Sequence, residues 1–485
     1  MPKICGFVRF NAWRNTTEAL MRLVYNKNSN TKKRILFSKN NDSGAFVCLS
    51  SEIDSPAPYN IIYKNVKYTY IFDGKLENAT EVLNDISKDL GFLPTDEGDH
   101  ASIAAWAYIL WGGSSPCKLD GKFAYAIYSE EIMSCTRHTP RIFIARDKAG
   151  IKPIYFTYDN NDTIIFSSDI SAILSCKSCG AKLDKQGLWQ ALYLSGGSID
   201  GQTLFKDVYE LACGCCAYID CRSDGLFCVM QKRYHSILSL DKTTPTEVSF
   251  DEIDFIEDND DFCKDKTIED LVSSVEITEF PVFQQNFTIL RSAKNSSITH
   301  FSSIGREVFE NQKRYLRSFF PWVNDPYRGI ELYNQDVISH IEGFNWLQGL
   351  FEKYINYLPS ELTEEQKQMT LKYLYLLPNK LKFNERIADH FNVEINYPYA
   401  AASVFKYYFQ NFERQIHMRT KPNKKISEFN TELKRELQDV MSNSENRINY
   451  LIDRRAVDLC DDPDTLEKVY LFHTWLEKFK VTFDF

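Results

Sequence analysis

Cysteine is the residue type with the greatest chemical potential in this chain, which contains 13 of them among 485 residues. Seven fall within one stretch: Cys176, Cys179, Cys213, Cys215, Cys216, Cys221 and Cys228. A CxxC pair followed by CGCC could supply four thiolates to a zinc ion. The second group is CxCC rather than CxxC, and the neighbouring CCAYIDC alternates like a buried strand. The spacing therefore favours buried, reduced thiols over a metal site.

Two other segments contain residues suited to binding an ion or a phosphate. EDNDD at 257–261 lacks the glycine at position 6 and the glutamate at position 12 of a calcium loop, which favours a solvated linker. LSGGSIDG (Leu194–Gly201) has the glycines of a phosphate loop, but no strand signal precedes it, so we interpret it as a turn. His100 and His390 form no evident triad, and surface or helix packing explains both.

The composition is that of a folded, acidic protein. There are 57 Lys and Arg against 66 Asp and Glu, a formal charge of −9, and 44% hydrophobic residues. A negative balance argues against a general nucleic-acid binder, because affinity for polyanions comes mainly from Lys and Arg. No apolar run approaches the ~20 residues that span a bilayer, and MPKICGFVRF lacks the organisation of a signal peptide. We expect a cytoplasmic protein with no membrane or nucleic-acid partner.

Short aromatic or β-branched segments dominate residues 1–235 and predict strands: YTYIF, FAYAIY, RIFIAR, PIYFTY and TIIFSS. Two stretches, TTEALMRLVY and HASIAAWAYILWG, predict helices.

Residues 249–270 contain ten Asp or Glu and two Lys, which predicts an exposed linker. Further on, Thr363 and Gln366 predict a capping box, and Asp464 is expected to cap a final helix with apolar residues at helical spacing, namely Leu466, Val469, Phe472, Leu476 and Phe479.

Five blocks within residues 71–211 resemble, in the same order, the glutaminase domain of glutamine-dependent asparagine synthetases. IFDGKLEN, LDGKFAYAIY, RIFIARDKAGIKPIYF, IIFSSDISAIL and TLFKDVYEL correspond to the family patterns FNGEIYN, LNGMFAFAI, LFLARDRFGIKPLYY, FASEIKALL and TIFKGIRKL. A weaker match joins ERIADHFNVEINYPY (Glu385–Tyr399) to DRMSMAHSLEVRVPFLD, and KVYLFHTWLEKF to the closing helix of the synthetase domain. Lasso-peptide cyclases and β-lactam synthetases share this layout.

The resemblance implies two linked reactions. An N-terminal Cys acts as nucleophile and, through its free α-amine, as base. An Asn side chain and a Gly backbone N–H stabilise the oxyanion, while an Arg and an Asp hold the glutamine carboxylate and amine. Ammonia then reaches a second site, where an SGGxDS loop binds ATP phosphates and acidic residues hold magnesium while a carboxylate is adenylated.

Carried over to this sequence, the glutaminase roles fall on Cys5, Asp73 and Gly74 as catalytic residues and on Asn78 and Asp99 as substrate-binding residues. Three departures accompany this match. Four residues precede Cys5, so its α-amine stays in a peptide bond after removal of the initial methionine. Asp73 stands where the family has Asn, and an ionised carboxylate cannot donate a hydrogen bond. SKNNDSG (Ser38–Gly44), the best counterpart of the family's RGPDD, contains no Arg.

The synthetase site has fewer counterparts. No SGGxDS follows the linker. The family's GEGADELFGGY aligns best with SSIGREVFENQKRY, which retains Glu307 but has Ser303 and Arg306 at two acidic positions. Asn396 and Ala401 replace the Arg and Asp of the EVRVPFLD block. Lys424 or Lys425 corresponds to the catalytic Lys, with a solvated basic patch as the alternative interpretation.

We therefore expect an α+β protein with three parts. These are an αββα, Ntn-hydrolase-like glutaminase domain over residues 1–235, an acidic linker over 236–275, and an α-rich, shortened asparagine-synthetase-like domain over 276–485. The leading hypothesis is ATP- and magnesium-dependent amide formation on a carboxylate, with glutamine as nitrogen source or with a peptide substrate. The alternative is a catalytically inactive pseudoenzyme, without a cofactor, that serves as a binding or scaffold protein. We expect a small-molecule or peptide substrate as the partner, and a homo-oligomer stays open.

Overall fold

The computed structural model describes residues 4–9, 34–40, 44–50, 59–132, 141–159, 163–176, 181–193, 199, 201–221, 227–239, 300–309, 320–321, 332–340, 343–391, 393–411, 427–460 and 463–483. The chain divides into two compact units. One consists of Met1–Gly180 and Asp207–Ser239, and the other of Ala181–Lys206 and Leu240–Phe485. Residues 181–206, which the sequence-based division placed in the first domain, therefore belong to the second unit.

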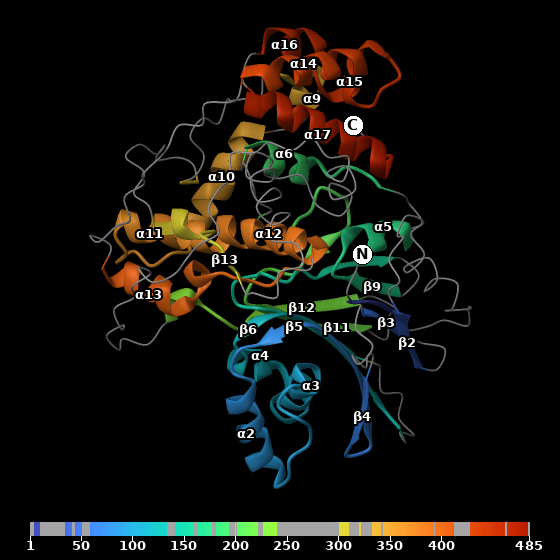
Figure 1. Ribbon diagram of the computed structural model, residues 1–485, viewed down its shortest axis with the longest axis vertical. Coiled ribbons are helices and arrows are strands. Elements are labelled where there is room, and N and C mark those ends of the chain that lie inside the picture. Colours follow the sequence, from blue (N-terminus) through green and yellow to red (C-terminus); the bar gives the residue numbers. More distant parts are fainter. Residues whose placement is uncertain are drawn as a thin grey trace. The chain divides into compact units, whose positions relative to one another are not determined.

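Two six-stranded antiparallel sheets form the framework of the first unit (Figure 1). In spatial order, the first sheet contains β10 (Tyr209–Glu210), β8 (Tyr155–Asp159), β9 (Thr163–Ser167), β1 (Ile4–Arg9), β3 (Gly44–Ser50) and β2 (Arg34–Asn40). The second contains β12 (Phe227–Arg233), β11 (Cys215–Cys221), β7 (Arg141–Arg146), β6 (Gly121–Glu131), β5 (Val66–Leu76) and β4 (Tyr59–Tyr63). All five segments predicted as strands lie in these sheets.

Apolar side chains of both sheets meet in a shared core, which places the sheets face to face. Ile4 and Val8 of β1 belong to this core together with Ile71 of β5 and Ala124 of β6. The other face of the second sheet packs against α2 (Ala79–Leu90) and α3 (His100–Trp111) through a second core that includes Phe123. On the first sheet, α5 (Ile170–Cys176) packs against β8 and β9. The layers are thus helix, sheet, sheet and helix, and the predicted mixed α and β class is confirmed.

Short helical elements complete the first unit: η1 (Gly112–Ser114), α4 (Ser115–Lys118) and η2 (Ile237–Ser239). The predicted helix HASIAAWAYILWG is α3. The other predicted helix, TTEALMRLVY, and the acidic stretch at 249–270 lie outside the described residues.

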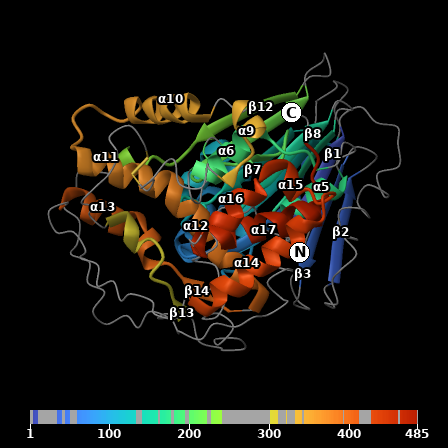
Figure 2. The same cartoon turned by 90° about the horizontal axis from the view of Figure 1, so that it is seen from above.

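The described residues of the second unit are mainly helical. Its elements are α6 (Lys185–Tyr193), β13 (His300–Phe301), η3 (Arg306–Phe309), α9 (Gln335–His340), α10 (Gly343–Asn356), α11 (Glu364–Leu371), η5 (Lys372–Leu376), α12 (Leu377–Phe391), β14 (Ile395–Asn396), η6 (Pro398–Ala400), α13 (Ala402–Gln410), α14 (Ser427–Ser442), α15 (Ile448–Leu451), α16 (Arg454–Leu459) and α17 (Pro463–Phe479). Helices α16 and α17 both pack against α14 (Figure 2). Within the part of the chain that is described, no helix has the length and apolarity needed to cross a membrane.

A long helical run, α11–η5–α12, begins at the predicted capping box. The Thr363 side chain accepts from the Gln366 backbone N–H, and the Gln366 side chain accepts from that of Thr363. The run changes from α-helix to the wider π-helical turn η5, in which the Leu377 N–H donates to the Lys372 carbonyl five residues earlier. Pro378 follows directly, and because proline has no N–H and crowds the carbonyl four residues earlier, a wider turn relieves the conflict.

The last helix confirms the predicted apolar face and corrects its start. Leu466, Val469, Phe472 and Leu476 are buried. Helix α17 begins at Pro463, so the prediction that Asp464 caps it is wrong, and Asp464 lies inside the first turn. Proline suits the first helical position because its fixed φ is already helical and its missing N–H would be unbonded there in any case.

The segment Ala181–Lys206 joins the end of α17 through backbone and aromatic contacts. Leu183 N–H donates to the Thr482 carbonyl at 3.0 Å, and Thr482 N–H donates to the Ala181 carbonyl at 3.0 Å. The Phe205 ring lies 4.9 Å from that of Trp475, and both side chains are fully buried. This segment is therefore part of the core of the second unit, although the chain before and after it belongs to the first.

Two glycines allow the ends of β5 and β6 to approach closely. Gly74 has φ +135°, and a Cβ there would lie 1.9 Å from the Lys122 carbonyl oxygen. Gly121 has φ +132°, and its Cβ would lie 2.3 Å from the Lys75 carbonyl oxygen. Both clashes involve backbone atoms, so no side chain can rotate to relieve them. The glycine in each of the two DGK segments, residues 73–75 and 120–122, is therefore required sterically.

Gly74→Ala is expected to lower the free energy of unfolding of the first unit by about 3 kcal/mol, because it adds both a forbidden φ and a backbone clash. Gly98→Ala is the matched control, since its Cβ would meet nothing within 4 Å. Thermal melts of the full chain would measure both. Equal melting temperatures for the two variants would contradict the steric explanation.

Candidate functional site

Cys5 lies on β1, an interior strand of the first sheet. It is fully buried and sits opposite Val47 of β3 and Ser167 of β9. Side chains alternate between the two faces of a strand. Because Ile4 and Val8 contribute to the core between the sheets, Cys5 is on the opposite face of β1. Ile4 continues the strand before it, so the Cys5 nitrogen is part of a β-ladder in the uncleaved chain.

Asp73 and Gly74 lie side by side near the end of β5. Asp73 is opposite Ala124 of β6, on the face that looks toward the first sheet. Its carboxylate is buried, and Oδ1 lies 3.9 Å from Nζ of Lys152, which is also buried. A buried carboxylate requires such a counter-charge, since desolvation of an isolated ion is very costly. Asp73 therefore exists as one half of an ion pair.

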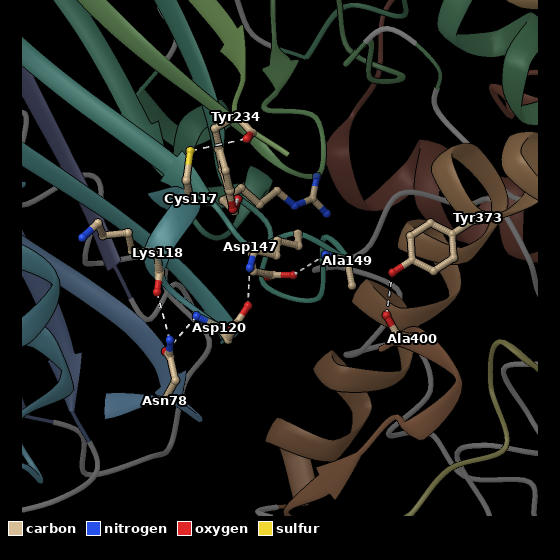
Figure 3. A network of polar contacts seen from close by, with 11 residues as sticks. Asn78, Cys117, Lys118, Asp120, Asp147, Ala149, Tyr234, Tyr373 and Ala400 are labelled. Carbon is tan, nitrogen blue, oxygen red and sulfur yellow. Dashed lines mark hydrogen bonds and ion pairs between the residues drawn. The ribbon is translucent and has the colours of Figure 1, made fainter. Parts of the chain in front are cut away.

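The turn after β7 positions Lys152. The Asp147 carboxylate accepts backbone N–H groups from Ala149 at 3.1 Å, Ile151 at 3.0 Å and Lys152 at 2.9 Å. Figure 3 shows Asp147 pointing at Ala149. Burial raises the pKa of Asp147, although these donors and the neighbouring guanidinium of Arg146 oppose the rise. The turn is thus closed around a single buried side chain.

Asn78 precedes α2 and uses its amide to hold the start of β6 (Figure 3). Its Nδ2 donates to the Lys118 carbonyl at 2.9 Å, and its Oδ1 accepts from the Asp120 N–H at 2.9 Å. Both ends of the amide therefore contact the protein backbone. This arrangement gives Asn78 a supporting role in placing Gly121 opposite β5.

Asp99 is the N-cap of α3. Its Oδ1 accepts from the Ser102 N–H at 3.0 Å, and its Oδ2 accepts from the hydroxyls of Ser102 at 2.6 Å and Thr95 at 3.3 Å. The Ser102 hydroxyl also contacts the Tyr70 hydroxyl at 2.8 Å. Burial and the nearby Lys75 ammonium lower the pKa of the adjacent His100 despite the opposing Asp99 charge. The carboxylate has about four acceptor positions, and these three donors leave room for about one more.

The synthetase candidates Arg306 and Glu307 lie on η3 of the second unit. Glu307 Oε1 is 3.1 Å from Lys380 Nζ, and Oε2 accepts from the Gly305 N–H at 3.0 Å. Lys372 of the π-helical turn donates to the Glu307 carbonyl at 3.2 Å. Burial opposes ionisation of Glu307, but Lys380 and the backbone donors outweigh it and leave the pKa of Glu307 lowered. Lys424 and Lys425 lie outside the described residues.

The cysteine-rich segment includes β11, as the CCAYIDC pattern predicts, and its Cys215 and Cys216 are buried. Burial raises the pKa of Cys215, and burial together with Cys215 raises the pKa of Cys216 to about 11, so both stay protonated at neutral pH. Among the side chains that the structure describes, no group of three or more His, Cys, Asp or Glu is placed to hold a metal ion. The side chains of Cys176, Cys179, Cys221 and Cys228 lie outside that part, as does most of Leu194–Gly201.

The sequence predicts that Cys5 lies in a cleft formed with Asp73, Gly74, Asn78 and Asp99. In the structure Cys5 is on the face of β1 away from the second sheet, whereas Asp73 is on the face of β5 that looks toward the first sheet. Sequence reasoning missed Lys152, which pairs with Asp73. The available signal was a lysine inside the apolar segment IKPIYF, since a buried lysine requires an anion. It also missed Lys372 and Lys380 around Glu307, which lie on a helix that the capping box already predicted.

Part of the chain is similar to known proteins. Residues 51–234 match the model of a glutamine amidotransferase domain. Asparagine synthetase [glutamine-hydrolyzing] 3 of Bacillus subtilis is 28% identical over 155 residues, which are 32% of this chain and 24% of that protein. Putative asparagine synthetase [glutamine-hydrolyzing] 2 of Methanocaldococcus jannaschii is 25% identical over 178 residues, 34% of this chain and 32% of that protein.

Among solved structures, the chain aligns with the glutamine phosphoribosylpyrophosphate (PRPP) amidotransferase of B. subtilis complexed with ADP and GMP. The alignment covers 48% of this chain and 43% of that chain, with 15% sequence identity and a TM-score of 0.29. The sequence matches above span a quarter to a third of each curated relative's length. Residues 51–234 are thus similar to glutamine amidotransferase domains, and the chain is similar to asparagine synthetases over about a third of its length.

Proposed function

We propose that this protein is a glutamine-dependent amidotransferase that supplies nitrogen for amide formation on a carboxylate. The observation that carries the proposal is the amidotransferase match over residues 51–234. Within this proposal the first unit is the Ntn-hydrolase-like domain. The bounds 1–235, 236–275 and 276–485 are kept as predictions for the family domains, with Ala181–Lys206 inside the first range but part of the second unit. The acceptor carboxylate is a small molecule or a peptide.

In this function Cys5 is the nucleophile, and its α-amine is the base once the Ile4–Cys5 bond is opened. The Gly74 N–H is the oxyanion donor. Asp73 cannot donate in its ionised form, but Lys152 offsets its charge, so the pair presents no net repulsion to a developing oxyanion. Asp99 holds the glutamine amine through its remaining acceptor position, and Asn78 keeps the neighbouring backbone in place.

The described residues around Glu307 do not suit a magnesium ion. The carboxylate is already engaged by Lys380 and the Gly305 N–H, and Lys372 and Arg306 add further positive charge nearby. Such surroundings favour a phosphate over a divalent cation. ATP is therefore retained in the proposal as the activating cosubstrate of the family, and no step is assigned to magnesium here.

A second candidate is a catalytically inactive protein that keeps the fold as a binding or scaffold module. The Asp73–Lys152 pair favours it, because a buried ion pair replaces an amide donor at the oxyanion position. The two candidates differ in one measurable property, the release of ammonia from glutamine.

The chain starting at Cys5, prepared by a site-specific protease, is expected to hydrolyse glutamine to glutamate and ammonia. The unprocessed chain, in which the Cys5 nitrogen is still in a peptide bond, is expected to release no ammonia. Asp73→Asn should not restore ammonia release in that chain, since the α-amine that serves as the base is still missing. Cys5→Ser should abolish turnover, whereas Cys117→Ala, a change at an exposed thiol, should not. A folded but inactive Cys5-first chain would favour the scaffold candidate.

Lys152→Met is expected to lower the free energy of unfolding by about 3 kcal/mol, because it leaves the buried Asp73 carboxylate without this counter-charge. Lys148→Met is the matched control. Lys148 pairs with Asp120, which is half exposed, so its loss should cost no more than about 1 kcal/mol. Urea titrations of the two variants would report the difference. Similar midpoints would show that the Asp73–Lys152 pair contributes little.

A further inference from the structure

Cys117 in the short helix α4 and Cys216 on β11 each bond to the backbone beside the other. Cys117 Sγ donates to the Tyr234 carbonyl at 3.4 Å (Figure 3). Tyr234 is held beside β11, because its N–H donates to the Gly214 carbonyl at 2.9 Å. In turn, Cys216 Sγ donates at 3.9 Å to the carbonyl of Gly113, which lies four residues before Cys117. The two thiols therefore point into the same small region between α4 and β11, and neither is part of a disulfide.

The turn before α4 lies directly over the face of β11 that carries Cys216. A Cβ on Gly113 would come within 2.6 Å of the Tyr218 hydroxyl, and Tyr218 is two residues after Cys216. Because side chains alternate along a strand, Tyr218 and Cys216 are on one face of β11. The side chain of a helical residue leans toward the N-terminal end of its helix, so that of Cys117 leans back toward Gly113. The path of α4 thus directs the Cys117 thiol toward the Cys216 thiol.

The electrostatic surroundings of Cys216 also include Cys117. Burial, followed by the thiols of Cys215 and Cys117, raises the pKa of Cys216, while Lys232 opposes the rise. Cys215 is the preceding residue, whereas Cys117 is 99 residues away in the sequence. Because Coulomb interactions fall with distance, the influence of Cys117 requires that the two thiols be near each other in space. The hydrogen bonds and the electrostatics therefore indicate the same thiol pair.

We propose that Cys117 and Cys216 form a reversible disulfide when the protein meets hydrogen peroxide. The sulfur of Cys117, which is exposed, attacks the peroxide, so that an S–O bond forms, the O–O bond breaks and one water leaves. The sulfur of Cys216 then attacks the sulfenic acid on Cys117, so that the S–S bond forms and the S–OH bond breaks. The Cys216 thiol proton leaves with the hydroxide as a second water. The two thiols lose two electrons, and the peroxide gains them.

The bridge joins α4 covalently to β11. The carbonyl of Lys118, the residue after Cys117, accepts from Asn78, and Gly121 at the start of β6 follows three residues later. An oxidised chain therefore has a fixed connection between β11 and the segment that leads into β6. Because the bridge closes a long loop, it also lowers the conformational entropy of the unfolded chain and stabilises the first unit. This inference does not depend on the proposed function.

The test compares the reduced and the peroxide-treated full chain by non-reducing peptide mapping with mass spectrometry. We expect a linked peptide that contains Cys117 and Cys216, is lighter by two hydrogen atoms than its two separate peptides, and is converted back to them by dithiothreitol. Oxidation should raise the melting temperature by roughly 5–10 °C. Both results should be lost in Cys117→Ser, a change at an exposed side chain, and kept in Cys460→Ser, a change at a half-buried thiol outside the pair.

A folded wild-type chain in which Cys117 stays reduced, or is oxidised only to a sulfenic or sulfinic acid, would overturn the proposal. So would a Cys117 peptide linked to a cysteine other than Cys216, or a linked peptide whose yield grows with protein concentration, since the bridge would then join two chains. A Cys216→Ala chain should lose the linked peptide but keep the sulfenic acid on Cys117, which dimedone would trap. Absence of that adduct from a folded Cys216→Ala chain would refute Cys117 as the thiol that meets peroxide first.

Discussion

The first unit depends on the burial of one carboxylate, that of Asp147. Besides closing the turn at residues 149–152, Asp147 accepts from the Phe123 N–H at 3.4 Å through its side chain and donates its own N–H to the Phe123 carbonyl at 2.8 Å. Its carbonyl accepts from the Gly214 N–H at 2.8 Å, immediately before β11. One residue therefore joins β6, the end of β7, the following turn and the start of β11. Its loss would leave several buried backbone donors without this acceptor, which is more costly than the loss of one surface bond.

Buried charges at this end of the sheets are arranged in pairs around that turn. Arg146 lies 2.8 Å from Glu210 and donates to the carbonyls of Leu211 and Gly150 at 2.7 and 2.6 Å. Lys152 faces Asp73. Because each cation is matched by an anion from a different strand, the pairs fix how the strands meet as well as balancing charge. In this context the Lys152 ammonium offsets the charge of the buried Asp73 carboxylate.

Strands and helices with strong local patterns could be predicted from the sequence. FAYAIY and the IFIA of RIFIAR are apolar on both faces because both faces of β6 and β7 are covered, and the Thr363 capping box is a purely local signal. The start of α17 was misjudged by two residues, since a proline at the first helical position and an aspartate cap give similar patterns. Contacts between residues that are far apart in the sequence could not be predicted from local patterns. Asp73 and Lys152 are 79 residues apart, and the membership of Ala181–Lys206 in the second unit depends on Trp475 and Thr482, which lie almost 300 residues further along the chain. The roles of Asp99 and Asn78 were inferred from the resemblance, whereas in the structure Asn78 contacts neighbouring backbone and Asp99 accepts from the Ser102 N–H and from the hydroxyls of Ser102 and Thr95.

The path of the chain between its units limits how the protein can be divided or recombined. It leaves the first unit after Gly180, returns at Asp207, and leaves again after Ser239. A gene fragment cut at the end of the amidotransferase match would encode α6 and Phe205 without Trp475, and the remaining fragment would encode Trp475 without Phe205. To exchange the first unit with the corresponding part of a relative, three junctions would be needed. One lies before residue 181, one after residue 206 and one near residue 239. No single cut in the chain can therefore separate the two units.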